Sequence, residues 1–390
     1  MRALRASQAF DGERFIGPVD VVIEDGRVIE VSPARERADV VIEHLGDVTV
    51  LPGLVDAHQH LSWDCSVDPL GWHRDSDDEA LLEKARENAR RALRAGVTTV
   101  RDLGARGRVS LDLRDELVAD PGSGPRVLAA GPALTTPGGH CYFLGAECAD
   151  TASLVGTVGR LVDAGADVIK VMATGGNVTP GSLPHEAQFG VAELRAVVEA
   201  AHGAGVPVAA HAHGTDGVVH ALEAGVDTIE HCSFMTADGI AHDPQLIQRL
   251  ATSGTFVVLT AGTLPGPMLP AIAARLPALV AHVQALIEAG VRCVLATDAG
   301  IGPPKPHDVL PVAVTQAVDQ AGVPVAEALA MCTSRAAAAL AIGDTAGSLA
   351  PGRPADLLVV DGRLDLDPAA VLRPVRVMRL GVDVLDTPVI

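Results

Sequence analysis

Two histidines near the start of the chain stand at alternate positions of a predicted strand. The segment Leu54-Val-Asp-Ala-His58-Gln-His60 has the character of a buried strand. Alternate side chains of a strand point to the same face, so both imidazoles can hold one metal ion from one side. The spacing alone also fits a coincidental surface pair. A place at the carboxyl end of a strand favours the metal site, because parallel α/β barrels carry their sites there.

Three further residues that can ligate a metal also stand where a predicted strand ends. His211 ends Val206-Pro-Val-Ala-Ala-His211, His231 ends Asp227-Thr-Ile-Glu-His231, and Asp298 ends Val291-Arg-Cys-Val-Leu-Ala-Thr-Asp298. Each one alone fits a partly buried polar residue with satisfied hydrogen bonds. Together with the first pair, they predict a metal centre.

Lys170 lies inside the apolar segment Ala166-Asp-Val-Ile-Lys-Val-Met-Ala173, and the only other lysines are Lys84 and Lys305. A buried ammonium is costly unless it is paired or loses its proton. The neutral amine can react with carbon dioxide to form a carbamate, whose two oxygens can bridge two metal ions. The alternative is a buried salt bridge, for instance to Asp298 or Asp102.

The elements that must position these residues follow one repeated pattern. A helical run ends at a glycine, and a β-branched strand begins at once. The glycines of the six repeats are Gly96, Gly165, Gly205, Gly225, Gly254 and Gly290. Glycine after the last helical turn adopts the left-handed conformation that turns the chain back. The repeated helix, glycine and strand predict a parallel α/β fold.

Two more strands, near residues 51–57 and 126–130, bring the predicted number to eight. We therefore expect a (β/α)8 TIM barrel over residues 51–346, with an open doubly wound sheet as the alternative. A capping box at Ser76-Asp-Asp-Glu79 is expected to start the first barrel helix, which leaves residues 61–75 as a long loop. Residues 1–50 and 347–390 read as short alternating strands, and we expect them to form one small β-sandwich domain.

The bulk composition excludes several classes of partner. The 390-residue chain has a formal net charge of −19, which argues against nucleic acid as a partner. None of its apolar stretches reads as a membrane span, and its start does not resemble a signal peptide. Six scattered cysteines without a CxxC pair predict neither disulfides nor a thiolate zinc site. We expect a cytoplasmic enzyme acting on a small-molecule substrate; the oligomeric state stays open, a homo-oligomer included.

The same residues carry a family resemblance over nearly the whole chain. Asp56-Ala-His58-Gln-His60, Lys170, His211, His231 and Thr297-Asp298 resemble the metal set of the amidohydrolase superfamily. Further motifs are similar to its imidazolonepropionase-related group: Thr136-Pro-Gly-Gly-His140, Lys170-Val-Met-Ala-Thr-Gly-Gly176, Ala210-His-Ala-His-Gly214 and Gly225-Val-Asp-Thr-Ile-Glu-His231. Within it, the chain is most similar to the prolidase-like dipeptidases, which have two metals and a carboxylated lysine. Imidazolonepropionases proper are expected to use one metal and no bridging lysine.

This resemblance implies a ligand set and a mechanism. His58, His60, Lys170 and Asp298 would hold one metal, and Lys170, His211 and His231 the other. The two divalent ions would activate a bridging hydroxide for attack on a carbonyl. Asp298 would accept its proton and pass it to the departing amine. Histidine and carboxylate ligands suit zinc best, with manganese, cobalt and iron as alternatives.

Residues near the predicted metals are candidates for binding the substrate. His140 follows two glycines and is a candidate to act on the substrate carbonyl or bind a substrate carboxylate; a structural loop histidine is the alternative. His213 stands two residues after His211, and Arg74 is a candidate carboxylate clamp or simply a solvated side chain. Six aromatic residues are assigned to loops around the metals, and predict either an aromatic pocket or loop anchors: Trp63, Trp72, Tyr142, Phe143, Phe189 and Phe234.

Three functions remain open on the sequence alone. The first is hydrolysis of a carbon–nitrogen amide bond in a dipeptide or N-acyl amino acid, prolidase-like substrates included. The second keeps the metals but hydrolyses a lactone, an ester or a cyclic amide. The third is a metal-binding scaffold without turnover, against which the retained Asp298 argues.

Overall fold

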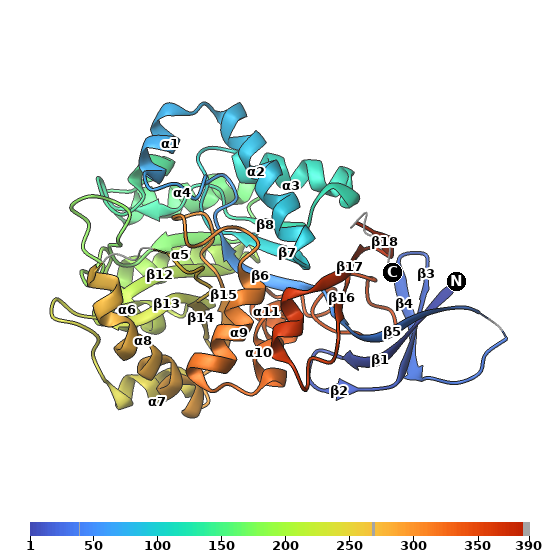
Figure 1. Cartoon of the computed structure of the whole chain (residues 1–390). Helices are drawn as coiled ribbons and strands as arrows, with labels where there is room; N and C mark the ends of the chain where they lie inside the picture. The colour runs from blue at the N-terminus through green and yellow to red at the C-terminus, as the bar shows by residue number, and fades with distance from the viewer. Residues whose placement is uncertain (39, 267–269, 385–390) are drawn as a thin grey trace.

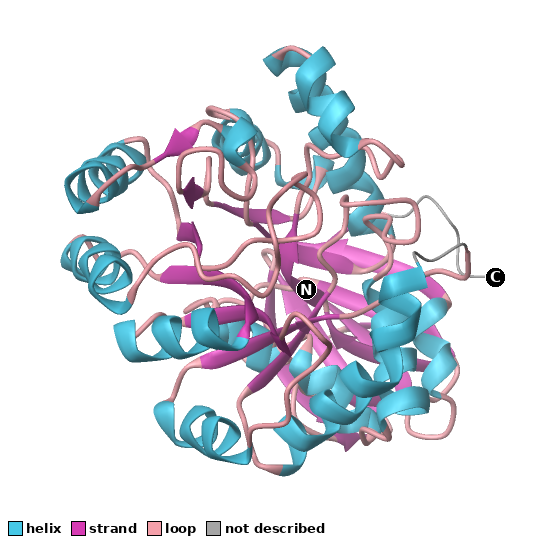
Figure 2. Cartoon of the chain, turned by 90° about the vertical axis from the view of Figure 1, so that its left-hand side faces the viewer, coloured by secondary structure: helices cyan, strands magenta, loops and turns pink. Residues whose placement is uncertain are grey.

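The computed structural model describes residues 1–38, 40–266 and 270–384, and shows a barrel-like α/β body beside a terminal β-sheet (Figure 1). The strands of the body are β6 (Leu54–Gln59), β7 (Val97–Asp102), β8 (Arg126–Ala129), β11 (Ile169–Met172), β12 (Val208–Gly214), β13 (Thr228–Met235), β14 (Phe256–Thr260) and β15 (Cys293–Ala296), with two short strands, β9 (Leu134–Thr135) and β10 (Ala146–Glu147). Seen from one end, the strands gather in the centre and helices lie around them (Figure 2).

The parallel strands form two arcs. One arc has the order β6-β7-β8, and the other has the order β10-β9-β11-β12-β13-β14-β15. Backbone hydrogen bonds link the arcs on both sides. Asp298 N, just after β15, donates to His58 O of β6 at 2.8 Å. Asp167 N, just before β11, donates to Ala129 O of β8 at 2.9 Å. The carboxyl ends of the strands therefore share one end of the body.

The helices alternate with these strands as the sequence pattern predicts. They are α1 (Pro69–Asp75), α2 (Asp78–Arg94), α3 (Val109–Ala119), α4 (Thr151–Asp163), α5 (Val191–Gly203), α6 (Thr215–Ala224), α7 (Pro244–Ser253), α8 (Pro270–Glu288), α9 (Leu310–Ala321), α10 (Val325–Met331) and α11 (Ser334–Ala339), with short 3-10 turns η1 (Pro121–Ser123), η2 (Tyr142–Leu144) and η3 (Pro368–Leu372). All six glycines of the repeat have positive φ, between 74° and 89°. They therefore turn the chain from helix to strand as expected.

The start of the first barrel helix differs from the expected capping box. Ser76 ends the additional helix α1, and its backbone N–H donates to Trp72 O. Asp77 is the N-cap of α2, and its carboxylate accepts a hydrogen bond from Ala80 N at 2.9 Å. Aspartate is as good an N-cap as serine, so the helix starts one residue later.

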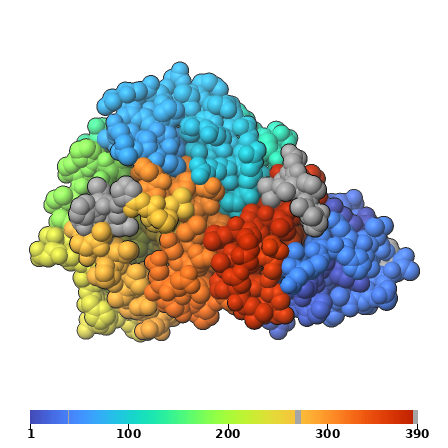
Figure 3. Space-filling view, in the orientation of Figure 1, coloured from blue at the N-terminus to red at the C-terminus, as the bar shows by residue number. Residues whose placement is uncertain are grey.

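Both ends of the chain contribute to one mixed sheet. Its strands are β1 (Arg2–Phe10), β2 (Phe15–Ile16), β3 (Val19–Glu24), β4 (Arg27–Pro33), β5 (Val41–Pro52), β16 (Leu357–Asp361), β17 (Pro374–Arg379) and β18 (Val382–Asp383). They run in the order β18-β17-β16-β5-β1-β3-β4, with β2 beside β1. Figure 3 shows the two terminal segments side by side on one flank. This sheet has its own buried apolar cluster, which includes Leu4, Val21, Val50 and Leu357.

Among the described residues, no helix combines the length and the apolar character needed to cross a bilayer.

Candidate metal centre

The structure brings all six predicted metal ligands to the carboxyl ends of the strands. His58, Lys170, His211 and His231 belong to β6, β11, β12 and β13, while His60 and Asp298 follow β6 and β15. Each of the six is at most 8% exposed. So many polar side chains are buried together only where they bind one another or a ligand.

His58, His60 and Asp298 form the first group, with their potential ligand atoms within 4.8 Å of one another. The Nε2 atoms of His60 and His58 lie 3.1 and 3.4 Å from Asp298 Oδ1. Burial raises the pKa of the Asp298 carboxyl, but the two histidines lower it by more, so its net pKa lies well below the usual value. Asp298 is therefore ionised and can accept a cation or a proton.

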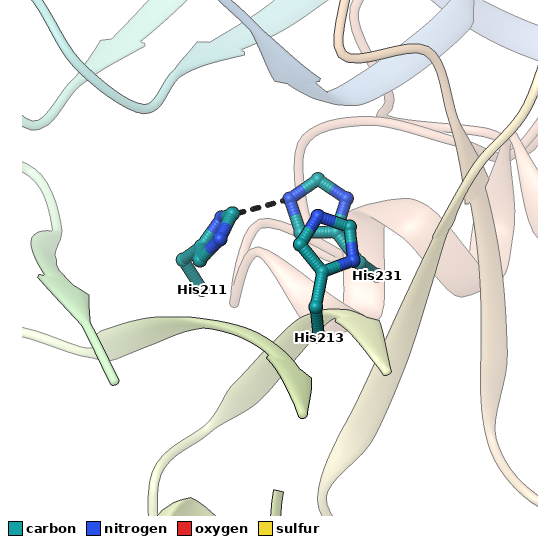
Figure 4. Close-up of side chains that lie close together, drawn as sticks. All are labelled: His211, His213 and His231. Atoms are coloured by element: carbon teal, nitrogen blue, oxygen red, sulfur yellow. Dashed lines mark hydrogen bonds between the residues drawn. The ribbon is translucent and has the colours of Figure 1, made fainter. Parts of the chain in front are cut away.

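His211, His213 and His231 form the second group, by the same 4.8 Å measure (Figure 4). The rings of His213 and His231 are stacked at 4.3 Å, and His231 Nε2 lies 3.0 Å from His211 Nδ1. Burial is the main cause that lowers the pKa of all three, to about 4 for His213. The neutral imidazole that results is the form that binds metals. The sequence assigned His213 to substrate, whereas the structure also groups it with these two candidate ligands.

The outer nitrogens of the histidines are already engaged. His58 Nδ1–H donates to Glu230 Oε2 at 2.7 Å, and His211 Nε2–H donates to Gly175 O at 3.0 Å. His231 Nδ1 lies 2.9 Å from Thr260 Oγ1. One ring nitrogen of each is thus fixed by the protein and the other faces its group. Metal-ligating histidines are held in this way, so the residues present fit a metal.

Lys170 is buried to 1% exposure on β11. Among the residues that the structure describes, its ammonium has no hydrogen bond and no ion pair. The alternative salt bridge is not formed, because Asp298 binds the histidines and Asp102 accepts from the backbone N–H groups of Leu61 and Gly104. Burial lowers the pKa of Lys170 to about 8, although Glu230 and Asp298 raise it. Lys170 therefore loses its proton far more readily than an ordinary lysine, and the neutral amine is the form that reacts with carbon dioxide.

Glu230 and Arg101 are functional candidates that the sequence analysis did not single out. Arg101 Nη2 donates to Glu230 Oε1 at 2.9 Å, and Thr228 Oγ1 donates to the same oxygen at 2.5 Å. Burial raises the pKa of Glu230, but Arg101 and His58 bring it down to about 2. The ionised carboxylate therefore orients the His58 ring. Glu230 and Arg101 are buried charges in predicted strands, and that was the available signal.

Backbone geometry explains why Glu230 and His231 both reach the site. Consecutive residues of a regular strand face opposite sides. His231, however, has a φ of +68°, in the left-handed region, and Asp298 has a φ of +59°. Such conformations cost free energy in residues other than glycine, and they persist where the surrounding structure holds them. Here they turn two candidate ligands away from the regular alternation.

A cavity of about 330 Å³ contains the site and tests the predicted substrate residues. His140, His213 and Trp63 line it. The His140 ring lies 4.8 Å from the His211 ring, and its Nδ1 has no hydrogen-bond partner among the described residues. The structure does not bring Tyr142 or Arg74 into the lining. Tyr142 is 41% exposed in the 3-10 turn η2, and Arg74 is paired with its neighbour Asp75 on α1.

The expected aromatic pocket is replaced by an aliphatic one. Of the six aromatic residues assigned to loops around the metals, Trp63 lines the cavity and the other five do not. Phe189 and Phe234 are buried in the main apolar core, and Phe234 belongs to strand β13 rather than to a loop. For these two, the prediction of an aromatic pocket is wrong; the alternative of loop anchors fits Phe189, whereas Phe234 is a buried strand residue.

A parallel α/β body that gathers neutral histidines and a carboxylate at the carboxyl ends of its strands defines a metal-dependent enzyme. Known proteins similar to the chain agree with this class.

The chain belongs to the amidohydrolase family, whose model matches residues 49–384. It is 29% identical over 358 residues to ochratoxinase of Aspergillus niger, covering 80% of this chain and 70% of that protein. It is 26% identical over 388 residues to imidazolonepropionase of Rhizobium rhizogenes, covering 91% and 89%. A solved structure of a Xaa-Pro dipeptidase with bound methionine is similar at a TM-score of 0.84 and 27% identity, covering 98% and 99%.

These similarities confirm the resemblance to the amidohydrolase superfamily with prolidase-like relatives, and the TIM-barrel fold. The protein is a hydrolase that acts on carbon–nitrogen bonds.

Proposed function

We propose that the protein hydrolyses the amide bond of a dipeptide or an N-acyl amino acid, prolidase-like substrates included. The observation that carries the proposal is the position of Lys170 beside both groups of candidate ligands. Lys170 lines the same cavity as His58 of one group and as His211 and His231 of the other. The similarity to a Xaa-Pro dipeptidase supports the same substrate class.

Two divalent cations, zinc first among them, fit the residues present. His58, His60 and Asp298 would hold one, His211 and His231 the other, and Lys170 would serve both as a carbamate. The carbamate forms when the neutral amine adds to carbon dioxide and releases one proton. When bound, the cations would supply a water activated for attack at neutral pH and would polarise the scissile carbonyl.

The chain's own residues would then manage protons and position the substrate. Asp298, ionised and next to His58 and His60, would accept the proton of the attacking water and pass it to the departing amine. His140 is buried, and burial lowers its pKa to about 3, so the ring is neutral. Its unpartnered Nδ1 would be available to a polar group of the substrate.

The test is turnover of metal-loaded protein on Xaa-Pro dipeptides, N-acyl amino acids, lactones and esters, with the Asp298→Asn variant alongside. We expect amide turnover, and a loss of about 10² to 10⁴ in kcat for the variant while most metal is retained. Asp344→Asn, at an exposed position, is the matched control. Turnover of lactones alone would contradict the amide assignment, and full activity of Asp298→Asn would contradict the proton-transfer role.

We further propose that the eight strands close into a complete barrel over residues 51–346. Residues 1–50 and 347–390 would form a separate small β-sandwich, which is supported by the separate apolar cluster of the terminal sheet. We also propose a cytoplasmic location and a small-molecule substrate as the partner, with homo-oligomers allowed. The six free cysteines fit a reducing compartment.

A further inference from the structure

The cavity that contains the candidate metal ligands continues into a lobe lined by aliphatic side chains. We define this apolar lobe by Leu276, Leu279 and Val283 of α8, Leu259 of β14, and Ala317 and Ala321 of α9. All six line the same cavity as His58, His211 and Asp298. A molecule held at the metal ligands can therefore extend into the lobe.

One face of α8 supplies much of the lobe. Leu276, Leu279, Val283 and Ile287 follow helical spacing, so their side chains share a stripe. An apolar helix stripe is normally packed against the core, as Val283 and Ile287 are here, yet Leu276 is 40% exposed and Leu279 is only half-buried. Apolar surface left open to water is unfavourable, and an apolar group that covers it gains free energy.

Two polar side chains of the cavity wall near the lobe, Lys305 and Gln316, are already bonded to the backbone. Lys305 Nζ donates to three backbone carbonyls, those of Thr260, Ala261 and Thr297. The side-chain amide of Gln316 accepts from Thr263 N and donates to Thr263 O. All three donor positions of the Lys305 ammonium are thus directed at the backbone, and the Gln316 amide is held in place by Thr263.

The described lining residues also lack a free carboxylate for the α-ammonium group of a dipeptide. They include no arginine, and their single carboxylate, Asp298, is bound to His58 and His60. A free α-ammonium group would therefore lose its water without gaining an ionised partner, which is costly. An acyl group in place of the free amino terminus removes this cost.

We propose that the substrate is an N-acyl amino acid whose acyl group is uncharged, aliphatic and long enough to occupy the apolar lobe. This rests on the proposed amide hydrolysis and narrows it. The amino-acid half stays with the polar side chains near the candidate ligands, His140 and His213 among them.

The experiment compares kcat/KM for N-acetyl, N-butanoyl and N-octanoyl derivatives of one amino acid with that for a free dipeptide. We expect an increase of roughly fourfold per added methylene until the lobe is filled, and the dipeptide to be the poorest substrate. Ala321→Phe fills the lobe, so the octanoyl compound should lose its advantage in kcat/KM over the acetyl compound. Ala278→Phe places the same side chain at an exposed position of α8 outside the lining.

A second variant and a binding measurement keep the inference testable if Ala321→Phe does not fold. Val283→Asn introduces a polar group into the lobe and should weaken binding of octanoate, but not of acetate, in titration calorimetry of the purified protein. Equal kcat/KM for all chain lengths, with metal-dependent turnover, would overturn the lobe assignment and leave amide hydrolysis standing. Absence of turnover on every amide would instead overturn the proposed function.

Discussion

The imidazole of His58 is held at Nδ1 while its Nε2 faces the other candidate ligands, and this shows how single residues set up the site. Glu230 accepts from its Nδ1–H, and its Nε2 faces Asp298. Glu230 is in turn held by Arg101, which also donates to the Ala57 carbonyl at 2.7 Å on the strand that carries His58. The candidate ligand is therefore positioned before any metal binds, so that little ordering remains to be done on binding.

Replacing Glu230 by glutamine should weaken metal binding without unfolding the protein. The amide keeps the size of the side chain but removes the charge that orients His58. We expect a loss of about 10- to 100-fold in metal affinity, measured by competition with a chromogenic chelator. Glu116→Gln, at an exposed position paired with Arg86, is the control. Unchanged affinity in Glu230→Gln would show that Arg101 and Thr228 suffice.

Replacing Lys170 by alanine removes the proposed shared ligand, so the variant should bind less metal than the native chain. The native chain is expected to bind about two metals, as a two-metal site requires. We expect the variant to bind fewer, and bicarbonate or short carboxylic acids to restore part of the metal and the activity. Elemental analysis and activity assays measure both effects. Lys84→Ala, on the surface of α2, is the control. One tightly bound metal that is indifferent to Lys170 would contradict a shared ligand.

At the scale of elements, the repeated glycines made the body of the fold predictable. Each demands a left-handed backbone where a helix must end, so the sequence marks the turn directly. The strand ends then indicated where His58, His211, His231 and Asp298 lie, because parallel strands bring their carboxyl ends together.

The features that could not be predicted depend on local conformations that the residue types do not specify. Glu230 shares the site with His231 only because His231 adopts a positive φ. Arg74 lies on helix α1 and Tyr142 in the 3-10 turn η2, within connections between strands whose paths are set by contacts distant in sequence. Phe234 is part of a strand that extends further than expected, to Met235.

A pair of glycine substitutions tests the turn rule. Gly225 follows α6 with a φ of +85°, and Gly159 lies inside α4; in both cases a Cβ atom would meet nothing within 4 Å. Gly225→Ala should lower the free energy of unfolding by about 1 kcal/mol, because the left-handed conformation is strained for alanine. Gly159→Ala should raise it by about 0.5 to 1 kcal/mol. Urea unfolding measures both, and equal effects would contradict the conformational explanation.

At the scale of the whole molecule, many buried histidines make stability depend on pH. Burial lowers the pKa of His73 to about 3 and those of His58 and His307 to about 4. Their folded values lie below the unfolded value of about 6.5. The unfolded state therefore binds more protons below pH 6.5, and stability is lost as the pH falls from about 6.5 towards 4.

His73 isolates this effect from metal binding. It is not a candidate ligand, and neither ring nitrogen has a hydrogen-bond partner among the described residues. In metal-free protein, we expect the free energy of unfolding at pH 5 to be larger for His73→Phe than for the native chain. The difference grows by at most about 1.4 kcal/mol for each pH unit below 6.5. The difference should shrink at pH 8. Urea unfolding at both pH values measures it, and a gain that is the same at both would contradict the titration of His73.

The terminal sheet has a consequence for how the chain is made. β5 lies between β1 and β16, but Leu357, the first residue of β16, is synthesised roughly 300 residues after β5 ends. At about 5 to 20 residues per second, one edge of β5 stays unpaired for about 15 to 60 seconds on the ribosome. An open strand edge invites pairing with another chain. During this period, neighbouring ribosomes on the same mRNA carry nascent chains whose β5 edges are still unpaired and can pair with one another.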